Sequence, residues 1–176
     1  MMHKLSVLFR HLWRDVDDTR QVIPPDMLTR LTQRVAASEQ RHTGEIRVCV
    51  EASLPTSYLW RLGAQMPLKS LVRQRALAMF GKLGVWDTAH NNGVLVYLLL
   101  AEHAIEIVAD RGLAVRCSSD QFQAMVSRMA GAFKNQRYED GLTQALEEIS
   151  ALLVAHFPAA PGLPNQNELP DTPVLQ

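Results

Sequence analysis

The most apolar stretch of this chain runs from Val94 to Ala101 and is rich in branched side chains. It is too short to span a membrane, and its composition predicts a strand that is covered on both faces. The shorter run Ile105–Val108 predicts a second strand. Because only a short turn separates the two runs, we expect them to form an antiparallel hairpin at the centre of a sheet.

A second pattern, the alternation of apolar and polar residues, covers Glu45–Ala52. It predicts a half-buried strand with Ile46, Val48 and Val50 on the buried face. The helical periodicity of Leu68–Phe80 lies between this strand and the central one, and such a crossover makes two strands parallel. Further apolar stripes predict three helices, which start at Pro24-Pro25-Asp26, at Ser118-Ser119-Asp120-Gln121 and at Tyr138. We therefore expect one α/β domain, with a small mixed β-sheet flanked by helices.

The two ends of the chain differ from this central part, which would span residues 21–158. Residues 1–20 carry an apolar stripe at helical spacing and predict an N-terminal amphipathic helix. We expect this helix to pack on the domain or on a partner, and the alternative is peripheral contact with an anionic membrane surface. Residues 159–176 are rich in proline and poor in apolar side chains, which predicts a disordered C-terminal tail.

Composition narrows the range of functions. The 176 residues carry as many acidic as basic side chains, and a net charge of zero argues against nucleic acid as a partner. Cys49 and Cys117 form no Cys-x-x-Cys pair, so we expect buried free thiols in a reducing compartment. No export signal, membrane span or glycine-rich phosphate loop is recognisable. We expect a cytoplasmic protein without an organic cofactor.

One segment departs from the even distribution of charge. Between Glu51 and Asp87 there is no acidic residue, whereas Lys69, Arg73 and other cations occur there. This basic face could meet a phosphate, a lipid headgroup or an acidic partner. The alternative is a solvated helix face that the acidic residues of the last helix balance.

Candidate chemistry is predicted where three polar segments meet. The strand pairings bring Thr43-Gly44-Glu45, Asn91-Asn92-Gly93 and Asp110-Arg111-Gly112 to one edge of the sheet, with Asp87 in the loop before it. Four oxygen-bearing residues could bind Ca²⁺ or Mg²⁺ there, namely Glu45, Asp87, Asn92 and Asp110. Arg111 could hold a phosphate or carboxylate with two hydrogen bonds. The alternative is that these residues only shape the turns.

The same segments resemble the TPM domain family, over residues 24–158. The likeness is greatest to the short, soluble bacterial branch without a signal peptide or membrane helix. Its motifs correspond to His42-Thr43-Gly44-Glu45, Val85-Trp86-Asp87-Thr88, Asn91-Asn92-Gly93-Val94-Leu95, Glu106–Gly112 and His156-Phe157-Pro158. The chain departs from the pattern at Asn91, where many relatives have Asp, and at Asp110-Arg111-Gly112, where many have Gly-Tyr-Gly.

The resemblance implies a compact α/β sandwich and leaves the function broad. A thylakoid relative has been called an acid phosphatase, some members look like divalent-ion binders, and bacterial relatives are associated with the cell envelope. Because no nucleophile or general base is recognisable, we expect an interaction or regulatory module that binds a protein partner near the envelope. The alternative is a divalent-metal-dependent phosphatase, in which the ion activates water and Asp110 and Arg111 are the candidate catalytic residues.

Overall fold

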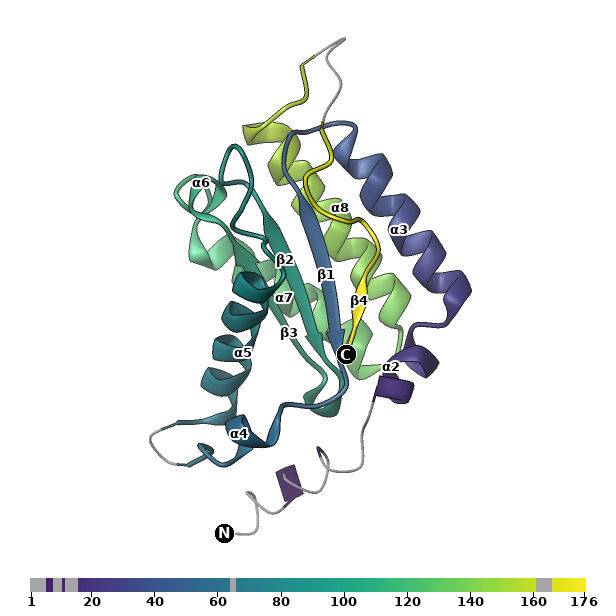
Figure 1. Ribbon diagram of the computed structural model, residues 1–176, viewed down its shortest axis with the longest axis vertical. Coiled ribbons are helices and arrows are strands. Elements are labelled where there is room, and N and C mark those ends of the chain that lie inside the picture. The colour runs from purple at the N-terminus through teal and green to yellow at the C-terminus, as the bar shows by residue number, and fades with distance from the viewer. Residues whose placement is uncertain (1–5, 8–10, 12–15, 64–65, 161–165) are drawn as a thin grey trace.

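The computed structural model describes residues 6–7, 11, 16–63, 66–160 and 166–176 (Figure 1). Its helices are α2 (Val16–Val22), α3 (Pro25–Glu39), α4 (Thr56–Leu59), α5 (Leu68–Lys82), α6 (Arg111–Ala114), α7 (Ser119–Lys134) and α8 (Tyr138–His156), with a 3₁₀ turn at Leu100–Glu102. Its strands are β1 (Ile46–Glu51), β2 (Val94–Leu99), β3 (Ala104–Ala109) and β4 (Val174–Leu175). The α/β class expected from the sequence is confirmed.

The strands form one mixed sheet in the order β3-β2-β1-β4. β1 and β2 run parallel, with Ile46 opposite Val94. β2 and β3 run antiparallel, with Val94 opposite Ala109. His103 lies in the turn between them at a φ of 47°, in the left-handed region that short hairpin turns use. Both the expected crossover through α5 and the expected hairpin are therefore confirmed.

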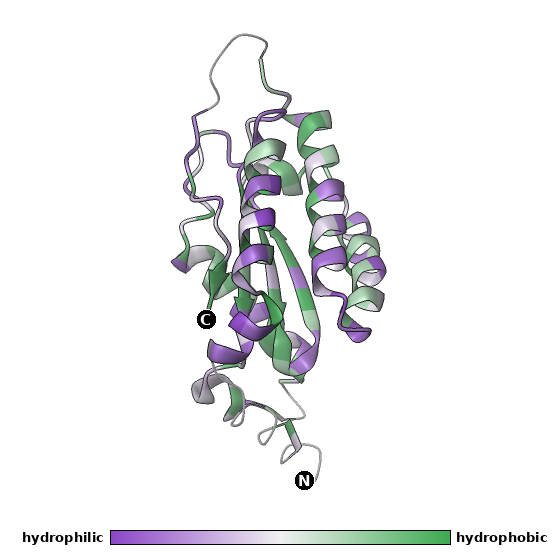
Figure 2. Cartoon of the chain, turned by 90° about the vertical axis from the view of Figure 1, so that its right-hand side faces the viewer, coloured by the Kyte–Doolittle hydropathy of each residue, from purple (hydrophilic) through white to green (hydrophobic). Residues whose placement is uncertain are grey.

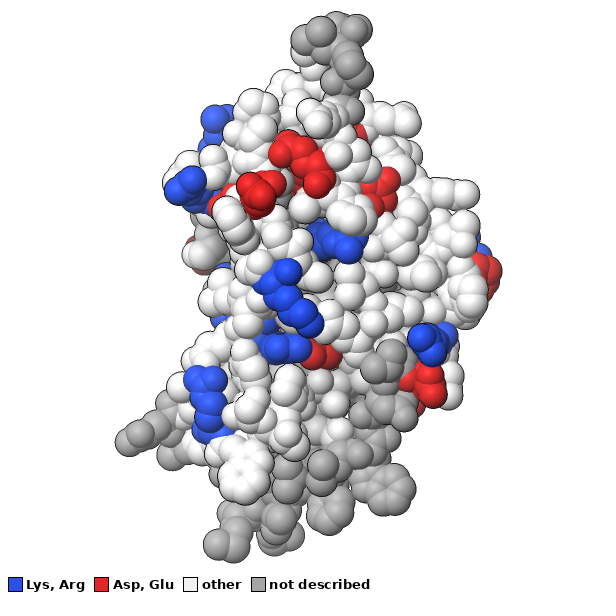
Figure 3. Space-filling view, viewed as in Figure 1, with Lys and Arg blue, Asp and Glu red and all other residues white. Residues whose placement is uncertain are grey.

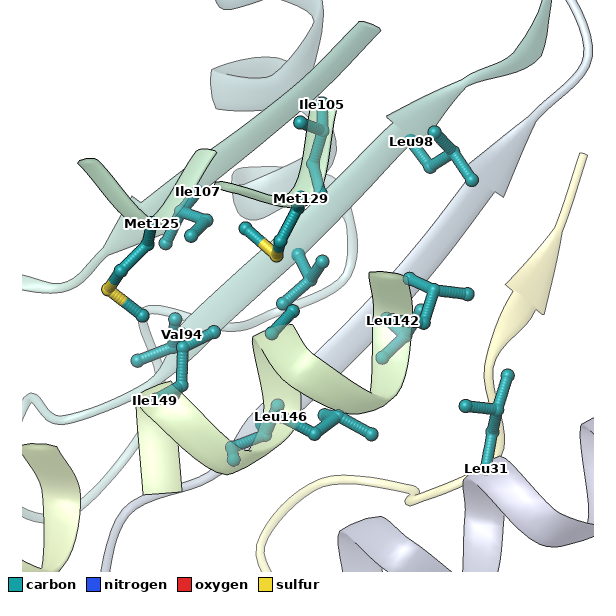
Figure 4. Close-up of a cluster of buried hydrophobic side chains, with 14 of the residues drawn as sticks. Leu31, Val94, Leu98, Ile105, Ile107, Met125, Met129, Leu142, Leu146 and Ile149 are labelled. Atoms are coloured by element: carbon teal, nitrogen blue, oxygen red, sulfur yellow. The ribbon is translucent and has the colours of Figure 1, made fainter. Parts of the chain in front are cut away.

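Helices cover both faces of the sheet (Figure 1). On one face, α3, α7 and α8 pack against the strands, and the buried side chains there include Leu31, Val94, Leu98, Ile107, Met129, Leu146 and Ile149 (Figure 4). On the other face, α5 packs over Cys49, Leu95 and Tyr97. Figure 2 shows apolar strands between helices that turn polar residues outward. Removing these apolar faces from water is the main stabilisation of the fold.

Local signals set the ends of the helices. The Ser118 hydroxyl accepts a hydrogen bond from the backbone N–H of Gln121, and the Gln121 side chain accepts one from the backbone N–H of Ser118 at 2.8 Å. This is the capping box that the sequence predicts at the start of α7. Pro25 begins α3, where its missing N–H costs no helical bond. Gly84 follows α5 with a φ of 68°, which glycine adopts without strain.

β1 is more buried than its alternating pattern predicts, because both of its faces are covered. On the polar face, Glu51 accepts hydrogen bonds from Arg75 of α5 and from the Tyr97 hydroxyl, the latter at 2.6 Å. Arg73 of α5 pairs with Glu106 of β3 at 3.1 Å. These two cations of α5 are thus balanced by the strands, and not by the last helix as the sequence suggested.

The C-terminal segment contradicts the expectation of a disordered tail. Residues 166–176 lie along β1 and end in β4, which pairs with β1 in parallel (Figure 1). The N–H of Ala52 donates to the carbonyl of Gln176 at 2.8 Å, and the N–H of Gln176 donates to that of Val50 at 2.9 Å. Arg47 donates to carbonyl oxygens of the same segment. Its order comes from backbone bonds to the open edge of β1, which proline content and low hydrophobicity do not reveal.

Most of the expected N-terminal helix lies outside the described residues. Val7 and His11 are described and buried. The His11 ring accepts a hydrogen bond from the N–H of Leu54 at 2.9 Å, and its other nitrogen lies 3.1 Å from the Glu102 carboxylate. These two residues therefore contact the domain. In the described parts of the chain, none of the helices has the length and apolar composition that crossing a membrane requires.

Candidate functional site

The three polar segments meet at one edge of the sheet, as the topology predicts. We call this region the loop edge, and it comprises residues 43–45, 91–93 and 110–112. The N–H of Asp110 donates to the carbonyl of Gly93, and the N–H of Gly112 donates to that of Asn91, both at 2.8 Å. The convergence is therefore built from backbone hydrogen bonds between the segments.

The glycines of the loop edge are required by close packing. A Cβ on Gly93 would lie 2.0 Å from the carbonyl oxygen of Val85, and one on Gly112 would lie 2.5 Å from that of Asn91. Neither approach is compatible with a side chain, so only glycine lets these segments pack backbone against backbone. Their presence is explained by the fold and requires no ligand.

Glu45 holds the C-terminal segment in place. The residue is fully buried, and its carboxylate accepts hydrogen bonds from the backbone N–H groups of Glu168 and Leu169 at 3.2 and 3.1 Å. Burial raises the pKa of Glu45, and the two N–H groups act in the opposite direction. Both of its oxygens already have donors, which accounts for this residue without a metal ion.

Asn92 and Asp110 each have one side-chain oxygen that accepts no hydrogen bond from the described residues. Asn92 is fully buried and its amide nitrogen donates to the Thr43 hydroxyl at 3.3 Å. Asp110 caps α6, and its Oδ1 accepts the N–H of Arg111 at 2.7 Å. The remaining atoms, Oδ1 of Asn92 and Oδ2 of Asp110, are buried and accept no hydrogen bond from the described residues. Buried polar atoms in this state are uncommon, and a bound cation would satisfy them.

The complete set of four predicted metal ligands does not assemble. Asp87 is exposed, in the turn before the loop edge. Among the described residues, no three His, Cys, Asp or Glu side chains are grouped so that they could hold a metal ion. Ca²⁺ takes six to eight oxygen ligands, whereas Mg²⁺ keeps several waters and needs only one or two carboxylates. The oxygens of Asp110 and Asn92 would therefore suit Mg²⁺ better than Ca²⁺.

Arg111 lies beside these two residues with part of its guanidinium unused. Its Nε donates to the Asn91 side chain at 2.9 Å, and the residue is exposed. Asn91 has a φ of 52°, in the left-handed region that Asn tolerates, and this turn directs its side chain to Arg111. The two terminal nitrogens of Arg111 make no hydrogen bond with the described residues, so they are able to bind an anion.

His42 supports the loop edge from within. One ring nitrogen lies 2.9 Å from the carbonyl of Gly44 and the other 2.9 Å from the Ser38 hydroxyl. Burial lowers the pKa of His42 to about 4, so the ring is neutral at pH 7. The N–H of the neighbouring Thr43 donates to the carbonyl of Phe157 at 2.9 Å, which joins the matching His-Phe-Pro motif to this segment.

Sequence reasoning missed the buried acid Glu39, which lies near Glu45 and the half-buried Asp171. Glu39 is 6% exposed, and its Oε1 accepts the N–H of Ile46 at 2.8 Å. Burial raises the pKa of Glu39 to about 9, and the charges of Glu45 and Asp171 add to the effect. The sequence pattern does not predict the raised pKa of Glu39. One reason is that Asp171 belongs to the C-terminal segment, and the sequence does not show that this segment packs against β1.

Sequence reasoning also missed a groove between α5 and α7. It is a hollow of about 770 Å³ that runs along β3, with Lys69 and Arg73 on one wall and Phe122 and Val126 on the other. The acid-free segment around α5 was the only signal in the sequence. Figure 3 shows Lys and Arg side chains over α5 on one face of the molecule. Several Asp and Glu side chains lie above them, in the upper part of this view.

Comparison with known proteins gives a family and a fold. The TPM domain family matches residues 16–152. Among solved structures, the chain is similar to the NMR structure of the BA42 protein from the psychrophilic bacterium Bizionia argentinensis, with a TM-score of 0.68 and 24% identity over 83% of this chain and 90% of that one. A search of curated proteins found no match. Since the family match spans most of the α/β domain, this chain belongs to the TPM domain family.

Proposed function

We propose that this TPM-domain chain is a non-enzymatic cytoplasmic module that binds a segment of a partner protein in the groove between α5 and α7. The observation that carries this proposal is the groove itself, a hollow of about 770 Å³ with an apolar wall, a basic wall and a strand at its base. Binding sites are concave, largely apolar and supplied with a few polar groups. The free, buried state of Cys49 and Cys117 supports a reducing compartment.

The loop edge supports the same proposal by what its residues already do. Its glycines are used in packing and the Glu45 carboxylate in holding the C-terminal segment. His42, a buried base next to Thr43, is hydrogen-bonded through both ring nitrogens. A general base has to reach the proton that it removes, and His42 has no free nitrogen with which to do so.

Selection from a library of random peptides tests the proposal. The full chain is immobilised beside two variants, Gln123→Trp, which fills the groove from an exposed position, and Gln33→Trp, which places the same side chain on exposed α3. We expect peptides that bind the native chain and Gln33→Trp and lose binding to Gln123→Trp. Failure to enrich any peptide, or enrichment of peptides indifferent to Gln123→Trp, would contradict the proposal.

A second candidate function is divalent-metal-dependent phosphoester hydrolysis at the loop edge. The buried free oxygens of Asn92 and Asp110 and the open guanidinium of Arg111 favour it. Bound there, Mg²⁺ would polarise a phosphoryl oxygen and supply a nucleophilic water. Asp110 and Asn92 would hold the ion, and Arg111 would orient the ester.

Two measurements test this second candidate. Titration with MgCl₂ should shift the amide resonances of Asn92 and Asp110, and p-nitrophenyl phosphate should then be hydrolysed above the rate of the metal alone. Asp110→Asn retains an oxygen to cap α6 and removes the charge, so it should abolish both effects. Hydrolysis that survives Asp110→Asn would place any activity elsewhere, and unmoved amides would exclude the ion.

A further inference from the structure

The outer side of β3 pairs with no other strand in the part of the chain that the structure describes. β3 is the last strand of the sheet on its side. The N–H of Asp110 points to β2, so the alternation of an antiparallel strand turns the backbone groups of Ile107 and Ala109 away from β2. Arg73 confirms this direction, because it donates to the carbonyl of Ile107 at 2.8 Å. A row of outward N–H and C=O groups is a template for an added strand.

The groove gives such a strand a place to lie. Ile107 and Ala109 line its base, α5 forms one wall and α7 forms the other. Side chains of a strand point alternately to the two faces of a sheet. Every second side chain of an added strand would therefore face α7, and the others would face α5.

The α7 wall of the groove favours apolar side chains in a bound strand. Phe122 and Val126 line it and are only partly buried, next to the core that Ile107 enters from β3. Apart from these, α7 contributes Ser119, Gln123 and Ser127 to the lining, all without charge. Covering the two apolar residues would remove their remaining surface from water.

The α5 wall of the groove favours acidic side chains in a bound strand. Lys69 and Arg73 line it, and Glu106 of β3 balances only one of them, by pairing with Arg73 at 3.1 Å. Lys69 is exposed, and the stretch between Glu51 and Asp87 contains no acid. The wall thus carries a surplus positive charge that a carboxylate of a partner would complement.

We propose that the groove binds an extended segment of a partner protein as a fifth strand beside β3, in which apolar side chains facing α7 alternate with acidic side chains facing α5. This proposal rests on the function proposed above and names the conformation and chemistry of the ligand. Backbone hydrogen bonds to Ile107 and Ala109 would supply affinity. Contacts with Phe122 and Lys69 would make binding specific for peptides with apolar and acidic side chains at the matching positions.

Amide hydrogen exchange with a designed probe tests the inference. The probe is a blocked seven-residue peptide in which Val alternates with Glu, added to the ¹⁵N-labelled full chain. The outward amides of Ile107 and Ala109 should exchange at least about tenfold more slowly when the peptide is bound. The amides of Glu106 and Val108 face β2 and should keep their rates, so they serve as internal controls.

Matched changes separate the two parts of the inference. N-methylation of alternate peptide bonds removes the donors on one edge of the probe and should abolish protection of Ile107 and Ala109. Lys69→Glu should weaken the probe by at least about threefold at low salt. Lys134→Glu, the same change at the far end of α7, should leave its affinity unchanged.

The outcomes distinguish this inference from the function that it extends. No binding of the probe at about 1 mM, equal binding of a probe with Lys in place of Glu, or binding without protection of Ile107 and Ala109 would overturn it. The proposed function would still stand if library peptides bound the groove. Protection of the same amides by rising protein concentration alone would make a second copy of this chain the occupant and would also overturn the inference.

Discussion

Replacement of Glu39 by Gln should make the stability of this domain less sensitive to pH. The Glu39 carboxyl is buried between α3, β1 and the C-terminal segment, where it meets the acids Glu45 and Asp171 and the cation Arg47. Burial raises the pKa of Glu39 from an ordinary value of 4.5 to about 9. The folded chain therefore keeps a proton that the unfolded chain releases above pH 4.5.

The size and sign of the effect follow from this difference. Because the folded-state pKa is the higher one, the contribution of Glu39 to stability is complete below pH 4.5 and falls as the pH rises toward 9. Each pH unit in this window costs about 1.4 kcal/mol, so the loss between pH 5 and pH 7 is roughly 3 kcal/mol. Gln keeps an oxygen for the N–H of Ile46 and carries no proton to lose.

Urea unfolding at pH 5, 6, 7 and 8 measures the prediction. The free energy of unfolding of Glu39→Gln minus that of the native chain should grow with pH by roughly 3 kcal/mol between pH 5 and pH 7. The contribution of His42 is common to both proteins and cancels in the difference. Glu147→Gln, at an exposed position of α8, should give a flat difference. A flat difference for Glu39→Gln as well would refute the reasoning.

Two further substitutions test the packing of the sheet. Gly93→Ala should destabilise the domain by about 3 kcal/mol in urea unfolding, since its methyl group would collide with the carbonyl of Val85, and an unchanged midpoint would contradict this. As its control, Gly131→Ala has open space around it in α7 and should stabilise by about 0.5–1 kcal/mol. Tyr97→Phe removes one of the hydrogen bonds to buried Glu51 and should cost about 1 kcal/mol, and a gain in stability would show that this bond does not stabilise the fold.

The sheet centre and the loop edge were predictable because short-range patterns specify them. The apolar run Val94–Ala101 predicts a buried strand, and the helical periodicity of Leu68–Phe80 predicts the crossover. Once these pairings are set, the meeting of Asn91 and Asp110 follows from topology alone. The start of α7 was predictable for a local reason, because Ser118 and Gln121 stand at capping-box spacing.

The rest depends on contacts that sequence patterns do not encode. β4 is held by a few backbone bonds to β1, and every residue except proline has both of the groups that make them. Asp87 and Glu45 are both acids near the loop edge in sequence, yet one is exposed and the other is committed to the N–H groups of residues 168 and 169. The groove lies between α5 and α7, and no pattern of residues or hydropathy predicts that these two helices line one hollow.

Chemical-shift mapping with a peptide from the library tests the central claim most directly. The claim is that this domain binds its partner through the groove and not through the loop edge. Amide shifts on titration should centre on the groove residues Lys69, Ile107 and Phe122, while the resonances of Asn92 and Asp110 stay in place. Shifts that centre on Asn92 and Asp110 and leave the groove unchanged would contradict the account.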